Sequence, residues 1–286
     1  MSSLVDSLRA VEADLGGGTL GVAAAHQGET VLYNADITFP TASVIKAAIV
    51  ADLYLQVEEG RLSPDAPVTV EAADVVAGSG VLCRLTPGLS LPLRDLALLA
   101  IMVSDNTASN LCLRAVGGPE AVNRRMHQEW GMPDTTIHRP IRFALGPDDP
   151  PHTATGTPRD MMHFMDGLAQ GTLLPEPARD AVLGLLETTT DASMLPRYLG
   201  VNPYAPELRA DAPPVTVLHK TGAVSGVRND AGILRRGGSG GSANDVAVCV
   251  YTKGVADDRW TPANAGSEAV ARVARLLRDH FWGHDA

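Results

Sequence analysis

Residues 43–60 read SVIKAAIVADLYLQVEEG, and the organisation of the chain can be worked out from this stretch. Its mainly apolar run predicts a helix from Ser43 to Glu59, and Gly60 suits the C-terminal end because glycine readily adopts positive φ. At a spacing of three residues, the Ser43 hydroxyl and the Lys46 amine lie on one side, one turn apart. A serine at a helix N-terminus lies beside unpaired backbone N–H groups that could stabilise an oxyanion, and desolvation should lower the pKa of a lysine in so apolar a helix. On its own, the pattern also describes an N-cap serine followed by a lysine that reaches to solvent.

Two further polar motifs interrupt apolar segments later in the chain. Ser104-Asp105-Asn106 separates helices predicted over Leu91–Val103 and Thr107–Val116, and by itself such a break is typical of helix capping. His219-Lys220-Thr221-Gly222 ends a predicted strand that begins at Val215, and a lone Lys-Thr-Gly is a common way to leave a strand. From composition alone, the three motifs are expected together in on the order of one chain in ten thousand. Their joint occurrence therefore indicates chemistry.

The order of predicted elements is helix, strands, a long helical block, strands, helix. The other predicted elements are helices over Leu4–Leu15, Pro119–Trp130, Pro158–Leu168, Glu176–Glu187 and Ser267–Phe281, strands over Thr19–His26, Thr30–Asn34, Val215–Thr221, Asp230–Leu234 and Val246–Thr252, and a hairpin loop over Gly237–Ser242. This order favours a sheet built from both ends of the chain and flanked by the terminal helices, with an inserted helical domain. We expect a discontinuous α/β domain of residues 1–42 and 205–286, and a helical domain of residues 43–204.

The composition excludes several classes of function. The 286 residues are 45% hydrophobic and carry a formal net charge of −10 without a basic cluster, so nucleic acid is not expected as a partner. Three cysteines and eight histidines show no metal-ligand spacing, so neither a metal nor another cofactor is expected. Of 23 basic residues only three are lysines, so a lysine inside a polar motif points to a chemical role.

No stretch of the chain approaches 18 uninterrupted apolar residues, so no membrane-spanning helix is expected. The N-terminus, MSSLVDSLR, lacks a basic start followed by an apolar run. The chain as written is therefore expected to be cytoplasmic, or periplasmic or secreted if a signal was removed.

Ser-x-x-Lys, Ser-Asp-Asn and Lys-Thr-Gly in this order are the signature set of class A β-lactamases and penicillin-binding proteins. The chain resembles a class A β-lactamase-type serine hydrolase over essentially its whole length, including the intervals of 61 residues from Ser43 to Ser104 and 116 from Ser104 to Lys220. Residues 188–192, TTTDA, resemble the Thr-Thr-Gly-Asp-Ala segment that precedes the third motif in that family. The resemblance implies a β-lactamase/transpeptidase-like fold of the α/β (α+β) class with an antiparallel sheet.

The same resemblance implies catalytic roles for four residues. Ser43 would be the nucleophile that opens an amide, with Lys46 as its base or proton shuttle. Ser104 would relay a proton to the leaving nitrogen, and Lys220 would bias Ser104 electrostatically.

Substrate-binding roles follow in the same way. Asn106 would hold Lys46 and the amide side chain of the substrate, while Lys220 and Thr221 would bind its carboxylate. The backbone N–H groups of Ser43 and of Ala223, which follows Gly222, would form the oxyanion hole. Arg228 could meet the carboxylate bidentately, or form a surface ion pair instead.

The chain departs from the class A pattern in the loop of residues 139–156. Class A enzymes carry a Glu-x-x-Leu-Asn there, whose glutamate positions the water that removes the acyl group, but Ile141 falls near the glutamate position. No carboxylate occurs between Asp134 and Asp148. Asp148, Asp149 and His152 are possible substitutes, although solvated loop residues are the simpler interpretation.

Three functions remain open at this stage. The first is a class A-like β-lactamase that is acylated at Ser43 and turns over more slowly than it acylates. The alternative is a D,D-peptidase-like or biosynthetic amide hydrolase or acyltransferase, and the third is a covalent penicillin-binding module. In each case the expected partner is a small-molecule substrate, and we expect the chain to be a monomer.

Overall fold

The computed structural model describes residues 3–201, 215–237 and 244–283, and its centre is a five-stranded antiparallel sheet. The strand order is β2-β1-β10-β9-β8, which pairs the two ends of the chain directly through β1 and β10. The strands are β1 (Thr19–His26), β2 (Glu29–Tyr33), β8 (Val215–Val224), β9 (Val227–Arg236) and β10 (Val246–Lys253). The predicted fold class is confirmed.

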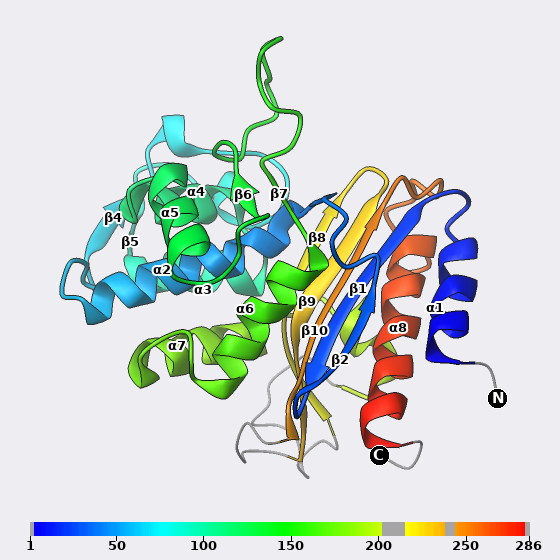
Figure 1. Cartoon of the computed structure of the whole chain (residues 1–286). Coiled ribbons are helices and arrows are strands. Elements are labelled where there is room, and N and C mark those ends of the chain that lie inside the picture. The colour runs from blue at the N-terminus through cyan, green and yellow to red at the C-terminus, as the bar shows by residue number, and fades with distance from the viewer. Residues whose placement is uncertain (1–2, 202–214, 238–243, 284–286) are drawn as a thin grey trace.

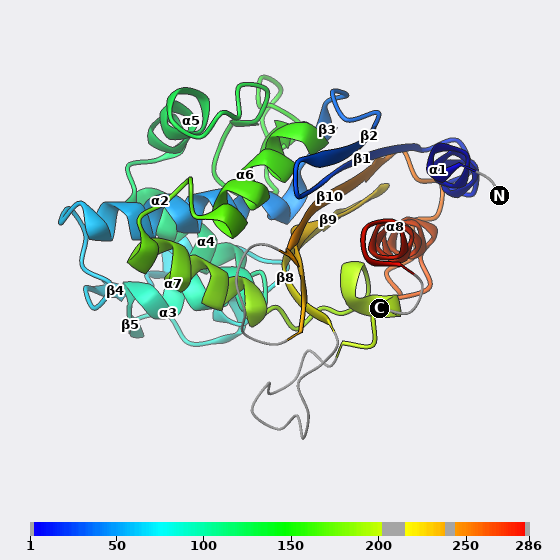
Figure 2. The ribbon, with the colours of Figure 1, turned by 60° about the horizontal axis from the view of Figure 1, so that its bottom comes forward.

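The sheet lies between two layers of helices (Figures 1 and 2). The terminal helices α1 (Leu4–Ala13) and α8 (Ala265–Trp282) pack on one face, and α6 (Pro158–Gln170) packs on the other. Apolar side chains from both sheet faces enter two separate cores, one under the terminal helices and one toward the helical region. This burial on both faces explains why β10 reads as a continuous apolar run, VAVCVYTK.

The helical region follows β2 along the chain and returns to the sheet at β8 (Figure 1). Its remaining helices are α2 (Lys46–Glu58), α3 (Leu93–Met102), α4 (Asn106–Ala115), α5 (Pro119–Gln128) and α7 (Glu176–Glu187). Its short strands are β3 (Phe39–Pro40), β4 (Pro67–Thr69), β5 (Ser90–Pro92), β6 (Thr136–Ile137) and β7 (Ala154–Gly156), and its 3₁₀ turns are η1 (Ala42–Ile45), η2 (Ala72–Asp74), η3 (Leu82–Arg84) and η4 (Leu195–Tyr198).

Several element boundaries differ from the sequence prediction. The helix expected from Ser43 begins as the 3₁₀ turn η1 and becomes α-helical at Lys46. The helix expected from Leu91 begins at Leu93, because Ser90–Pro92 pairs with β4 instead. Strand β9 begins three residues earlier than expected, directly after a two-residue turn.

Part of the predicted organisation lies outside the described residues. This is true of the domain boundary at 204/205 and of nearly all of the hairpin loop over Gly237–Ser242. Within the described ranges, no helix combines the length and the apolar character needed to cross a membrane.

Candidate active site

The turn η1 places Ser43 between the short strand β3 and helix α2, against strand β8. The turn is held by two contacts, from Thr41 N–H to the Ala154 carbonyl (3.1 Å) and from Asn229 Nδ2 to the Pro40 carbonyl (2.7 Å). Ala42 adopts a φ of 49°, a strained backbone for a non-glycine residue, directly before the serine. Ser43 itself is only half-buried. The turn therefore presents the serine at the surface from a rigid backbone.

Lys46 lies one turn after Ser43 and is fully buried. Its Nζ donates to the Ser104 carbonyl (2.7 Å), to Ser104 Oγ (3.2 Å) and to Asn106 Oδ1 (2.9 Å). Burial lowers the pKa of Lys46 well below its usual range, and the positive charge of Lys220 lowers it further, while Asp105 opposes both effects. A lysine in this setting gives up its proton more readily than an exposed lysine, as a general base requires.

The Ser104-Asp105-Asn106 motif joins the start of α4 to the loop of residues 77–82. Asp105 caps α4 through Ala108 N–H and also accepts the N–H groups of Val81 (2.6 Å) and Leu82 (2.8 Å). Asn106 Nδ2 donates to the Ala77 carbonyl (2.9 Å). The motif therefore caps a helix, as the sequence alone suggested, and it also brings Ser104 and Asn106 to Lys46.

Ser104 carries strain of its own. Its φ is 54°, which places a non-glycine residue in the left-handed region. Ser79, which the sequence analysis did not single out, lies beside it and donates from Oγ to the Ser104 carbonyl (2.7 Å). Backbone strain that the surroundings hold in place is frequent at functional sites.

Strand β8 forms the edge of the sheet beside Ser43, and Gly222 is where the two approach most closely. A Cβ on Gly222 would lie 2.8 Å from the Thr41 carbonyl oxygen and 2.9 Å from Ser43 N, so only glycine fits. Opposite Ala223 on β9, the Arg228 N–H points away from β8, toward Thr252 Oγ1. In an antiparallel sheet, two directly opposed residues point their N–H groups either both toward each other or both away from each other. Since Arg228 N–H points away from β8, Ala223 N–H points away from β9, to the free edge of β8.

Lys220 is fully buried on β8, and its Nζ donates to the Thr221 carbonyl (2.8 Å). Burial lowers its pKa to about 8, against the opposing charges of Asp230 and Asp191. Lys220 is also close enough to depress the pKa of Lys46, so the two buried lysines belong to one site.

Arg228 occupies β9 next to this edge. Its guanidinium donates to the backbone carbonyls of Val224, Val227 and Arg259 and stacks on Trp260 at 4.5 Å. Burial is the main cause that lowers its pKa, and Asp191 acts on it as it acts on Lys220. The surface ion pair considered for Arg228 is not formed at hydrogen-bond distance with any of the described residues.

A buried contact between His219 and Asp230, behind Lys220, was missed by the sequence analysis. His219 Nδ1 lies 2.9 Å from both carboxylate oxygens of Asp230, and Asp230 also accepts Leu195 N–H (3.0 Å). Thr189, in the TTTDA segment, donates to the His219 carbonyl (2.6 Å). The segment therefore supports strand β8 from behind, a contact between residues about 30 positions apart that no local pattern indicates.

The segment between β6 and β7 projects from the body of the molecule (Figure 1), and its base is fixed by side chains. The guanidinium of Arg139 donates to four loop carbonyls: those of Pro140, Arg142, Pro150 and Pro151. The Ile141 N–H and carbonyl are both bound by the side chain of Asn110, at 2.9 and 2.8 Å. Asn110 follows Asn106 by one turn of α4, so Ile141 is held next to the Ser104-Asp105-Asn106 motif.

Two of the possible substitute bases in this loop, Asp149 and His152, have pKa values lowered by their surroundings. Asp149 accepts hydrogen bonds from Gly146 N–H (2.7 Å) and from the Arg142 guanidinium, and both lower the pKa of its carboxyl group. Burial and the neighbouring His138 and Arg139 lower the pKa of His152. Among the described residues, no group of three or more His, Cys, Asp or Glu side chains is arranged to hold a metal ion.

This arrangement defines an active-site-serine hydrolase: a serine on a rigid turn, a buried lysine one turn later, a second serine bound to that lysine, and an outward N–H on an adjacent edge strand. Residues 3–281 match the model of the beta-lactamase enzyme family. The chain belongs to this family, as its motifs predict.

Known relatives agree with this assignment over different lengths. Beta-lactamase PSE-4 of Pseudomonas aeruginosa is 36% identical over 101 residues, a stretch that covers 35% of this chain and 35% of the relative. Beta-lactamase 3 of Bacillus cereus is 29% identical over 211 residues, 72% of this chain and 61% of the relative. The matched stretch thus spans about a third of the length of PSE-4.

Solved structures are similar over nearly the whole chain. A beta-lactamase from Sphaerobacter thermophilus superposes with a TM-score of 0.84 at 30% identity, covering 98% of this chain and 96% of that one. An acyl-enzyme complex of a PBP-A variant with penicillin G has a TM-score of 0.80 at 27% identity, covering 97% and 96%.

Proposed function

We propose that the protein is a serine hydrolase that opens β-lactam rings through a covalent acyl-enzyme at Ser43, and that its deacylation is slow. The observation that carries this proposal is the position of Lys46. Its Nζ is buried, has a depressed pKa and lies within hydrogen-bond distance of Ser104 Oγ, one helical turn from the nucleophile. The acyl-enzyme of PBP-A with penicillin G supports acylation by a penicillin on this architecture.

Acylation follows from the order of these groups. Lys46 first releases one of the three protons that it donates, and the neutral amine then takes the Ser43 proton as the serine oxygen attacks the lactam carbonyl. The N–H groups of Ser43 and Ala223 stabilise the oxyanion. Because Lys46 donates to Ser104 Oγ, the Ser104 O–H is free to point toward the leaving nitrogen. When the C–N bond breaks, Ser104 gives its proton to that nitrogen and is reprotonated from Lys46. Lys220 and Thr221 bind the substrate carboxylate, with Arg228 beside them.

Deacylation lacks an evident general base. Ile141, which the resemblance in sequence places near the class A glutamate position, has its backbone fixed beside α4 by Asn110. Asp149 already binds Arg142 and Gly146. Hydrolysis of the ester at Ser43 would therefore rely on a poorly activated water.

The test is intact-protein mass spectrometry during reaction with penicillin G, with product release followed in parallel. We expect a rapid adduct of one penicillin, a burst of product equal to the enzyme concentration, and a much slower steady state. Ser43→Ala should form no adduct, and Ser90→Ala, at an exposed serine of β5 outside the motifs, should retain it. Turnover by Ser43→Ala, or a linear time course without a burst, would refute the proposal.

A second candidate, a D,D-peptidase-like amide hydrolase or acyltransferase, is favoured by the same isoleucine. Without a water-activating carboxylate, an acyl-enzyme can pass its acyl group to an amine. Faster turnover of a D-Ala-D-Ala peptide than of penicillin G, with the adduct suppressed by an added amine acceptor, would favour this candidate.

A further inference from the structure

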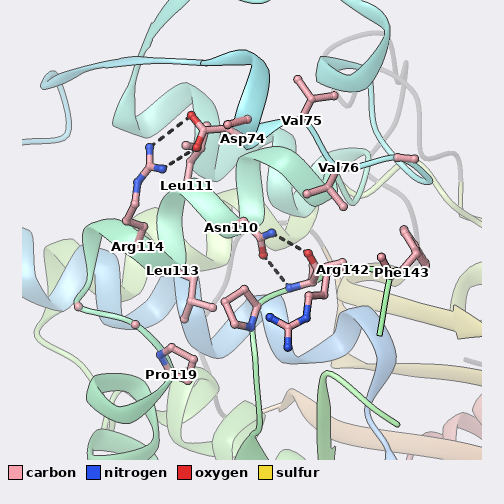
Figure 3. Close-up of a pocket in the computed structure, with 17 residues that line it drawn as sticks. Asp74, Val75, Val76, Asn110, Leu111, Leu113, Arg114, Pro119, Arg142 and Phe143 are labelled. Carbon is pink, nitrogen blue, oxygen red and sulfur yellow. Dashed lines mark hydrogen bonds and ion pairs between the residues drawn. The ribbon is translucent and has the colours of Figure 1, made fainter. Parts of the chain in front are cut away.

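A groove of about 770 Å³ lies beside the site, between residues 73–77, one face of α4 and loop residues 140–144 (Figure 3). We call it the side groove. Many of its lining side chains are apolar, among them Val75, Val76, Leu111, Leu113, Pro119 and Ile141. Its volume falls within the range of small-molecule pockets.

The ionised side chains that line the side groove are already paired. Arg114 binds Asp74 at 2.6 Å across one end, and Arg142 binds Asp149 at the loop. A charged ligand would have to compete with these pairs, whereas an apolar one would not. The chemistry of the lining therefore favours an apolar occupant.

The side groove borders the catalytic cluster at three residues. Ala77 lines the groove, and its carbonyl accepts Asn106 Nδ2, the amide assigned to the substrate. At the next residue, Gly78, an added Cβ would lie 2.9 Å from Asn106 Nδ2 and 3.3 Å from the ring of Phe143, so this glycine lies between the catalytic amide and a residue of the groove, with no room for a side chain. Phe143 also lines the groove and is 66% exposed.

We propose that the side groove binds the acyl side chain of the substrate, and that preferred substrates carry a long, apolar acyl chain. This inference rests on the proposed function, because it places the substrate amide at Asn106. From that amide the acyl chain passes Gly78, under Phe143, and lies along the apolar wall formed by Val76 and Leu111. The Asp74–Arg114 ion pair then marks the far end of the chain.

The test is a series of penicillins with one nucleus and acetyl, hexanoyl or decanoyl side chains. The second-order rate constant for adduct formation at Ser43 should rise with chain length, by roughly fourfold per methylene where the groove buries the chain fully. A rate independent of chain length would overturn this inference while leaving the proposed function intact. Absence of an adduct with every probe would overturn both.

A matched pair of variants tests the place of binding. Ala72 and Ala73 are neighbouring exposed residues of η2, but only Ala73 lines the side groove. Ala73→Trp should abolish the dependence on chain length and leave acylation by the acetyl probe unchanged, whereas Ala72→Trp should preserve the dependence. Ala144→Trp fills the groove from the opposite loop and should act like Ala73→Trp. Equal chain-length dependence in all three variants would refute binding in the groove.

Discussion

Replacing Gly222 by alanine should disturb the oxyanion hole more than it disturbs the fold. The new Cβ would meet backbone atoms at 2.8 Å (Thr41 carbonyl), 2.9 Å (Ser43 N) and 3.0 Å (Val44 N), each of them in or next to η1. Ordinary contact begins at 3.4 Å, so β8 and η1 must separate by about half an ångström. Overpacking of this kind costs about 1–3 kcal/mol, a fraction of the ~5–15 kcal/mol that stabilises a typical domain. The variant should therefore remain folded.

The same displacement moves Ser43 N–H away from Ala223 N–H, the two expected oxyanion donors. Loss of one such donor lowers rates by about 10²–10³, and half an ångström is a partial loss, so acylation should slow by roughly 10- to 100-fold. The assay is the rate of adduct formation with penicillin G, together with urea unfolding. Gly184→Ala is the control, because its Cβ would meet nothing within 4 Å in helix α7 and should stabilise that helix. Acylation of Gly222→Ala within threefold of wild type would refute the reasoning.

Three more predictions concern charge, deacylation and stability. The pKa of Lys220 is lowered to about 8, so Lys220 is protonated below that pH and neutral above it. The second-order acylation rate constant should therefore fall as pH rises through 8, and Lys220→Arg should move the fall to higher pH. A rate profile that is flat to pH 10 would contradict this prediction. Ile141→Glu should convert the persistent penicillin adduct into steady turnover, seen as loss of the burst, whereas Ile141→Gln should not; equal burst kinetics in both variants would contradict a role for this position. Asp105→Ala should lower the free energy of unfolding in urea by about 3 kcal/mol or more, because it removes a helix cap and leaves two N–H groups unpaired. Asp105→Asn should lose less stability. For Asp105→Ala, a loss below about 1 kcal/mol would show that other groups hold the loop.

The motifs could be found from sequence because each requires particular residue types at a short spacing. The i, i+3 spacing of Ser43 and Lys46 survives even though the first turn is 3₁₀ rather than α. The fold could be predicted from the order of the elements, because apolar strands near both ends of the chain indicate a sheet that both ends build together. Boundaries were less accurate where pairing with a distant segment decides them, as at Ser90–Pro92.

Contacts between residues that are far apart in the sequence could not be predicted, because they depend on how the chain folds. Asn110 looks like an ordinary polar helix residue, and only the fold brings it to Ile141, 31 residues later. Its spacing of four from Asn106 was the available signal, because residues one turn apart share a helix face. The Lys-Thr-Gly motif marks Gly222, but the physical reason for a glycine there, the approach of η1 to β8, depends on the fold.

Under the proposed function, the two buried lysines would make the charge of the substrate part of the mechanism. Burial lowers the pKa of Lys46, and the positive charge of Lys220 lowers it further, so the free site keeps Lys46 ready to accept a proton. A substrate carboxylate bound at Lys220 offsets that positive charge, and the proton affinity of Lys46 rises when the Ser43 proton must be taken. Deprotonation of Lys220 above pH 8 removes both effects, the anchor for the carboxylate and the change in field at Lys46. For that reason its titration should affect the acylation step itself as well as substrate binding, which a purely anchoring lysine would not do.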